Sequence, residues 1–324
     1  MIVSMKKIKY VAFFIILILM PPAYPAYSQT DYPSRPITLI VPRPPGGTLN
    51  LMSRSVADKM SKILGQPIVT ENRDMGGSGV VTTKTIIKGP PDGYTILLGY
   101  TSTLATGPNL LSDAGYDVRK DLTPIGAIGV APGLLLVHPS IPYQNVADLI
   151  THAKTSKEPF QIATPGISTI THFTAMLFAQ KAGIQFQYIP YKGSQAVTTD
   201  LIGSHVKIGF NPIPASYGAV EGKLLRALAS TSIKRSGILP NLPTIAETLP
   251  DFDAVLTYGL IAPAGTPNLI IQKLNSALRI SLATDEVKNI LYQEGAEPLL
   301  TTSEEYASII DKEETKWSSL IKFR

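Results

Sequence analysis

Three short segments combine glycine, proline and hydroxyl residues where an apolar run gives way to a helical pattern: residues 44–50, 164–169 and 191–195. Free backbone N–H groups at a helix start point outward and carry partial positive charge, which suits a carboxylate. The hydroxyl groups that add donors in these turns are those of Thr48, Ser168, Thr169 and Ser194. Any one such turn is also what an ordinary helix N-cap requires. Their recurrence predicts a shared anion-binding site.

The residue types that would support catalysis or metal binding are not arranged for it. The four histidines, His138, His152, His172 and His205, are scattered and form no HxxH or HExxH pattern. No G-x-S-x-G nucleophile turn, phosphate-binding loop or cysteine is present. A secreted hydrolase would need a catalytic cluster that this sequence does not display. We therefore expect a binding protein, not an enzyme, with no metal and no cofactor.

An alternation of short apolar runs and amphipathic segments positions the three turns. The run at residues 37–42 is typical of a buried strand, and apolar residues then recur at spacings of three and four up to residue 64. The alternation continues along the chain and predicts a parallel sheet with helices on its faces. Parallel strands bring such turns to one edge of the sheet, where ligands bind. Gly and Pro in residues 128–134 indicate a hinge between two lobes.

Composition favours an ordinary globular protein over a nucleic-acid binder. The chain has 324 residues, 44% hydrophobic and 16% charged, with a net charge of +5. Three of the 29 basic residues lie in residues 1–28, which leaves 26 basic against 24 acidic residues, a net charge of +2. No run of Lys and Arg with interleaved aromatic residues occurs, so we expect no nucleic-acid partner.

The first 28 residues have the layout of a secretory signal peptide. Lys6, Lys7 and Lys9 precede an uninterrupted apolar run at residues 10–20, and small residues follow at Ala26 and Ser28. The run is short for a membrane span, although an uncleaved anchor stays the alternative. We expect a protein exported to the periplasm.

Several motifs, taken together, resemble one protein family. They are "YPSRPITLIVPRPPGG", "GQPIVTENRDMGGSG", "PPDGYTILLG", "YIPYKGSQAVTTDLIGSHV", "GKLLRALASTSIKRS", "LPTIAETLPDF" and "YGLIAPAGTP". The chain resembles the Bug family, the periplasmic solute-binding proteins of tripartite tricarboxylate transporters, from about residue 32 to residue 317. The resemblance implies an α/β type II periplasmic binding protein fold, with two α/β lobes that close around a ligand cleft.

The resemblance also implies domain boundaries and a function. After the signal peptide at 1–28, lobe 1 is expected to comprise residues 29–130 and 250–324, and lobe 2 residues 131–249. The expected function is capture of a small carboxylate (a dicarboxylate, tricarboxylate or aromatic acid) for such a transporter. Its partners would be that solute and the membrane subunits; a sensor that reports to a signalling protein is the alternative. We expect a monomer.

Four positions depart from the family pattern. Arg43 stands where an aromatic residue is usual, Asn50 and Asn211 where Asp is usual, and Tyr258 where Trp is usual. Fewer carboxylates disfavour a ligand with an ammonium group. Arg43 favours a second anionic group on the ligand, and a solvated residue at the rim of the cleft is the alternative for it. We therefore expect a dicarboxylate or an aromatic acid rather than an amino acid. The candidate ligand-binding residues are Arg43, Pro45, Gly46, Gly47, Thr48, Asn50, Thr101, Ser102, Thr164, Gly166, Ser168, Thr169, His172, Tyr191, Lys192, Asn211 and Tyr258.

Overall fold

The computed structural model describes residues 32–46, 48–75, 79–110, 114–156, 159–167 and 169–321. All elements below belong to one compact unit within residues 33–324. The expected signal peptide lies outside the described residues, as do Gly47 and Ser168. None of the described helices is long and apolar enough to cross a membrane.

Three parallel strands begin the fold. Strand β1 (Ile37–Val41) pairs on one side with β2 (Ile68–Asn72) and on the other with β3 (Thr95–Tyr100). Helix α2 (Thr48–Leu64) connects β1 to β2, and α3 (Val80–Ile86) lies between β2 and β3 in the chain. Strand β1 is almost entirely buried, as expected for a strand covered on both faces.

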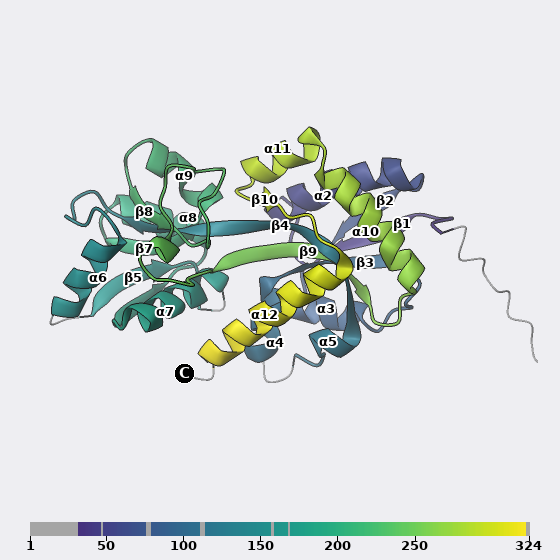
Figure 1. Ribbon diagram of the computed structural model, residues 1–324, viewed down its shortest axis with the longest axis horizontal. Coiled ribbons are helices and arrows are strands. Elements are labelled where there is room, and N and C mark those ends of the chain that lie inside the picture. The colour runs from purple at the N-terminus through teal and green to yellow at the C-terminus, as the bar shows by residue number, and fades with distance from the viewer. Residues whose placement is uncertain are drawn as a thin grey trace, which may run out of the picture. The chain divides into compact units, whose positions relative to one another are not determined.

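Two longer strands, β4 (Leu122–Val137) and β9 (Val255–Pro263), run antiparallel to each other (Figure 1). From Leu122 to Pro132, β4 pairs with β9, which pairs on its other side with β3. From Gly133 to Val137, β4 pairs instead with β7 and β8. Strand β4 therefore takes part in both halves of the strand order β2-β1-β3-β9-β4-β7-β5-β6.

The second half again alternates strands and helices. Its strands are β5 (Phe160–Thr164), β6 (Phe186–Pro190), β7 (Ile208–Pro212) and β8 (Arg226–Ser230). Strand β5 is parallel to β6 and β7, whereas β8 is antiparallel to β4. The helices are α6 (Val146–Thr155), α7 (Ile170–Ala182), α8 (Ser194–Ile202) and α9 (Ile213–Glu221).

The remaining elements are short turns and the C-terminal helices. The short ones are the π-helical turn η3 (Ser102–Thr106), α4 (Gly107–Leu110), α5 (Val118–Asp121), the 3₁₀ turn η4 (Ile245–Glu247) and β10 (Glu297–Pro298). The longer ones are α10 (Asn268–Leu282), α11 (Asp285–Gln293) and α12 (Ser303–Ile321). Strand β10 pairs antiparallel with β4.

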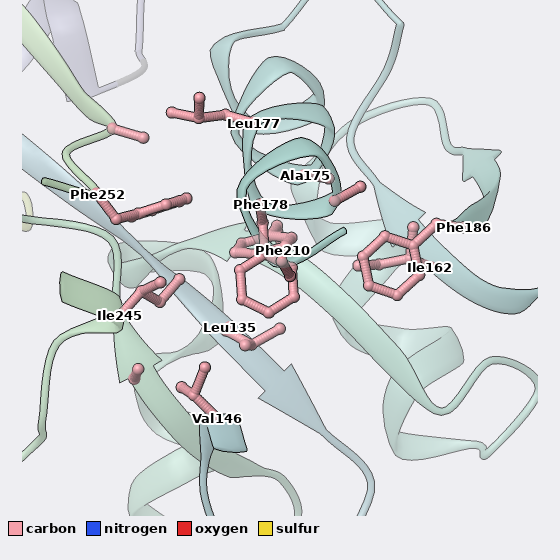
Figure 2. Close-up of a cluster of buried hydrophobic side chains, with 14 of the residues drawn as sticks. Leu135, Val146, Ile162, Ala175, Leu177, Phe178, Phe186, Phe210, Ile245 and Phe252 are labelled. Carbon is pink, nitrogen blue, oxygen red and sulfur yellow. The ribbon is translucent and has the colours of Figure 1, made fainter. Parts of the chain in front are cut away.

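An apolar cluster fills the space around α7, as the side chains in Figure 2 show. The ring of Phe178 has its centroid 5.7 Å from that of Phe210 and 6.2 Å from that of Phe252. Trp317 of α12 belongs to the same cluster, whereas Tyr306 of α12 is buried in a second cluster with β1, β3 and β9. Helix α12 therefore packs into both cores.

The expected mixed α/β class is confirmed, but the expectation of a parallel sheet needs correction. The sheet is not wholly parallel, because β4 and β9 are antiparallel to their neighbours. Residues 128–134, where a hinge crossing was expected, lie inside the continuous strand β4, whose pairing changes from β9 at Pro132 to β7 at Gly133. Pairing partners on both sides stabilise this segment as a strand despite its Gly and Pro residues, with irregularities in register near Gly126 and Gly129.

Candidate ligand-binding site

A cavity of about 340 Å³ lies where residues of β4, β7 and β9 meet several helix starts. Its volume is at the lower end of the range for small-molecule sites. The lining residues are Thr48, Ala131, Pro132, Gly133, Ile170, Thr171, Thr174, Ser194, Gln195, Pro212, Pro214, Ala215, Thr231, Ala254, Leu256, Tyr258 and Glu294.

Four helices begin at this cavity. Thr48 is the first residue of α2, Ile170 the first of α7 and Ser194 the first of α8, and Pro214 lies in the first turn of α9. The first N–H groups of each helix have no partner within the helix, and each helix start carries partial positive charge. The helix starts therefore place partial positive charge at the cavity wall.

Hydroxyl groups add further donors to the wall. Thr174 and Thr231 use their hydroxyls within the protein: Thr174 Oγ1 donates to the carbonyl oxygen of Ile170 and Thr231 Oγ1 to that of Ala254. The Thr48, Thr171 and Ser194 hydroxyls also line the cavity and form no side-chain hydrogen bond with another described residue. These three hydroxyls are placed to serve a ligand.

The charges around the cavity are few. Glu294 is the only carboxylate among the described lining residues, and none of those residues is Lys, Arg or His. Burial, together with the nearby Tyr100 ring and the charge of Glu294, raises the pKa of the Tyr258 hydroxyl, and the charge of Arg43 opposes this. Tyr258 therefore stays protonated and neutral at physiological pH.

Arg43 lies beside the site rather than in its wall. Its guanidinium carbon is 5.6 Å from the centroid of the Tyr100 ring, a cation–π distance. Burial raises the pKa of Tyr100 to about 12, against the lowering effect of Arg43. Arg43 thus forms a cation–π contact with Tyr100.

Of the sequence-predicted residues, Thr48, Ser194 and Tyr258 line the cavity. Asn211 does not, although it directly precedes the lining residue Pro212. Its side chain is fully buried, and Nδ2 donates to the Ser194 carbonyl oxygen, Thr198 Oγ1 and Ser216 Oγ. Asn211 therefore holds the starts of α8 and α9 against β7. Its Oδ1 has no partner among the described residues.

Asn50 is turned into its own helix. Its side chain is buried, and Oδ1 accepts a 3.4 Å hydrogen bond from Arg54 Nε. Neither asparagine is among the residues that line the cavity. The replacement of Asp by Asn at these two positions therefore says nothing about the charge of the cavity wall.

The predicted residues around the start of α7 support one another. Thr164 Oγ1 and His172 Nδ1 are 3.0 Å apart in a buried hydrogen bond, and Thr169 caps the helix by accepting from the His172 N–H. Gly166 adopts a φ of 136°, which favours glycine, and its carbonyl oxygen accepts from Thr169 Oγ1. These residues shape the turn while its neighbours Ile170 and Thr171 line the cavity.

The other predicted residues lie outside the cavity wall. Pro45, Gly46 and Lys192 are exposed. Tyr191 donates its hydroxyl to Asp200 Oδ2 at 2.8 Å, and Thr101 Oγ1 accepts from the Thr257 N–H at 2.9 Å. Ser102 is buried in η3. Gly47 and Ser168 belong to the turns but lie outside the described residues.

Sequence reasoning missed Thr231, Glu294 and the start of α9. The segment "GFNPIPA" follows the same strand-to-helix pattern as the three turns that were recognised, so α9 carried a detectable signal. Thr231 and Glu294 reach the cavity from distant parts of the chain, and their local sequence holds no comparable signal.

This fold and cavity define the class of periplasmic binding proteins, and comparisons with known proteins agree. The structure of the periplasmic binding protein BugD matches with a TM-score of 0.72 at 30% identity, over 90% of this chain and 98% of that chain. R. palustris Rpa4515 with adipate matches with a TM-score of 0.76 at 33% identity, over 90% and 98% of the two chains. The predicted two-lobed periplasmic binding fold is thereby confirmed.

The family is also established from sequence. The family model described as tripartite tricarboxylate transporter family receptor matches residues 52–324. Protein BugT of Bordetella pertussis (strain Tohama I / ATCC BAA-589 / NCTC 13251) is 34% identical over 297 residues, which cover 91% of each protein. The chain belongs to the tripartite tricarboxylate transporter receptor family, as its resemblance to the Bug proteins predicted.

Proposed function

We propose that the protein captures a small carboxylated solute in this cavity and delivers it to the membrane subunits of a tripartite tricarboxylate transporter. The observation that carries the proposal is the convergence of four helix starts on a cavity whose described lining contains no Lys, Arg or His. Adipate, a dicarboxylate, is the ligand named for one structural relative. The solute is bound and released unchanged.

Neutral donors suffice to hold a carboxylate. Each helix start contributes about 0.3–1 kcal/mol, and up to roughly 2 kcal/mol when partly buried. Each hydrogen bond to a charged group adds roughly 1.5–3 kcal/mol. Two helix starts with three or four donors reach about 8 kcal/mol before ordering costs, which corresponds to micromolar affinity.

The proposal includes where the protein works and how it moves. Residues 1–28 direct export to the periplasm and are removed. Residues 29–130 with 250–324 form one lobe, residues 131–249 form the other, and the lobes close on the solute as a monomer. The predicted residues around the turns at 44–50, 164–169 and 191–195 shape or contact the closed site.

The first test is thermal unfolding of the exported protein against mono-, di- and tricarboxylates, aromatic acids, amino acids and neutral sugars. A ligand at 100 times its dissociation constant adds about 2.7 kcal/mol of stability. For a chain of this length we expect the unfolding midpoint to rise by about 5 °C or more, with carboxylates only. A shift confined to uncharged solutes would contradict the proposal.

A deletion strain separates transport from sensing. If the protein serves a transporter, deletion abolishes uptake of the radiolabelled acid found in the thermal panel. If uptake persists and only the response of acid-induced genes is lost, the transporter assignment is wrong and the sensor alternative holds.

A further inference from the structure

We infer that Glu294 determines which second group a bound carboxylate carries: a hydroxyl, amide or ammonium donor is accepted beside Glu294, and a second carboxylate is not. The inference rests on the proposed function and narrows its ligand class. It starts from the position of Glu294 in the cavity wall, where it is the only carboxylate among the described lining residues.

The end of α11 fixes the position of Glu294. Glu294 is the residue that terminates α11, and Gly295 follows with a φ of 70°. A Cβ atom at Gly295 would lie 2.7 Å from Pro214 Cδ, so this corner packs directly on the first turn of α9. The side chain is thus set at the α9 side of the cavity by backbone packing.

The carboxylate of Glu294 is not neutralised by the protein. It is half-buried, and it forms no hydrogen bond or ion pair with any residue in the described part of the chain. No positively charged side chain is among the described lining residues, and Arg43 lies against the Tyr100 ring instead. A hydrogen-bond donor of the ligand placed here would bind the Glu294 carboxylate.

At the starts of α7 and α8, by contrast, the protein offers donors, and the ligand must supply a negatively charged acceptor. Thr171 and Ser194 offer hydroxyls there, together with the outward-facing N–H groups of the first turns. The start of α9 is less suited to an anion, because Pro214 has no N–H and Glu294 lies beside it. The cavity therefore has an anion-accepting part and a part that carries negative charge.

The position of Glu294 favours ligands with an ammonium group, which the sequence alone disfavoured. That argument set aside ammonium-bearing ligands because Asn50 and Asn211 replace Asp. Neither amide lines the cavity, whereas Glu294, which the argument did not consider, does. Hydroxy acids, monoamides and amino acids with a distal donor become the favoured members of the carboxylate class.

The test uses matched ligand pairs and isothermal titration calorimetry. The thermal panel first identifies the carbon chain length that stabilises the protein most. A dicarboxylate of that length, for example succinate or adipate, is then compared with its monoamide, succinamate or adipamate. The proteins are the exported wild type, Glu294→Gln, Glu294→Ala and the control Glu221→Gln. Glu221→Gln removes one negative charge, as Glu294→Gln does. Because Glu221 is exposed and lies outside the cavity, its substitution should not alter the cavity wall.

We expect wild type and Glu221→Gln to bind the monoamide at least tenfold more tightly than the dicarboxylate. Glu294→Gln and Glu294→Ala should reduce that ratio to near one or invert it. An equal ratio in wild type and Glu294→Gln, with carboxylates still bound, overturns the inference and leaves the proposed function standing. If no acid binds to any of the four proteins, the proposed function fails and the inference with it.

Discussion

At the scale of single residues, Asn211 shows how the cavity wall is held together. Its Nδ2 faces three acceptor oxygens from α8 and α9, the Ser194 carbonyl oxygen at 3.1 Å and two hydroxyls at 2.9 Å. A carbonyl oxygen can only accept a hydrogen bond, so the amide group must keep its NH₂ side toward it. Asn211 thus orients two helix starts without lining the cavity itself.

Replacing Asn211 by Asp tests this role. At pH 7 we expect the free energy of unfolding to fall by about 3 kcal/mol, because an ionised carboxylate cannot donate and would be buried against the Ser194 carbonyl oxygen. The same burial raises the pKa of the introduced carboxyl group above its unfolded value. The loss should therefore shrink as the pH falls and the group becomes protonated. Urea unfolding at pH 5 and pH 7 measures both effects.

Asn211→Ala is the matched control. It removes the same hydrogen bonds without adding a charge, so it should destabilise the protein by an amount that changes little between the two pH values. An Asn211→Asp variant as stable as wild type at pH 7 would show that Nδ2 is not needed at this position.

At the scale of elements, α12 contributes side chains to two separate apolar clusters. In this helix, Glu313 is 8% exposed, accepts a 2.7 Å hydrogen bond from Trp317 Nε1 and pairs with Lys316. Lys316 Nζ also donates to the carbonyl oxygen of Asp253, two residues before the start of β9. Burial raises the pKa of Glu313, the Lys316 and Trp317 contacts oppose this, and the charge of Asp253 adds to it.

The sign of the Glu313 effect gives a pH prediction. A carboxyl group whose folded-state pKa is raised favours the folded state when protonated, and this contribution is lost as the pH rises through the folded-state pKa. Relative to Glu313→Gln, which is always neutral, wild type should therefore gain stability as the pH falls from 7 to 4. Urea unfolding of both proteins across this range, with Glu221→Gln as an exposed control, checks it. A relative loss of wild-type stability at low pH would mean that the ion pair with Lys316 outweighs burial.

At the scale of the whole molecule, contacts between distant segments join elements on either side of the cavity. Glu297 of β10 accepts hydrogen bonds from Ser236 Oγ and from the Gly237 N–H, the latter at 2.7 Å. Strand β10 pairs with β4 near Gly129, whereas Ser236 follows β8. The contact therefore links the part of β4 paired with β9 to the loop beyond β8.

Replacing Glu297 by Ala should lower the free energy of unfolding by about 2 kcal/mol. Hydrogen bonds to a charged group contribute roughly 1.5–3 kcal/mol each, and the half-exposed setting of Glu297 reduces that contribution. Glu297→Gln keeps a carbonyl oxygen that can accept from the same two donors. Its free energy of unfolding should therefore fall by less than half as much as that of Glu297→Ala. Chemical denaturation of the three proteins measures the difference. Equal losses in the two variants would show that charge, and not the acceptor position, stabilises this contact.

The sequence by itself determined the local elements and the class of the protein. The helices after β1, β5 and β6 begin where Gly, Pro and hydroxyl residues predicted them. Such signals can be read locally because proline fixes φ, glycine permits left-handed turns and a hydroxyl caps an N–H a few residues away. The family motifs spread along the chain identified the fold, and they include the turn segments before the helices that follow β1 and β6.

Only the tertiary structure decided which of those residues meet at the cavity. Strand β4 runs through residues 128–134 because pairing with β9 and β7 outweighs the local breaking tendency of Gly and Pro, and Gly129 has no room for a Cβ beside the Glu297 carbonyl oxygen. Thr231 and Glu294 reach the wall through contacts with residues far away in the chain. Asn211 and Asn50 turn away from the cavity because nearby polar groups bind their amides. Side-chain direction depends on such partners, and no local pattern encodes them.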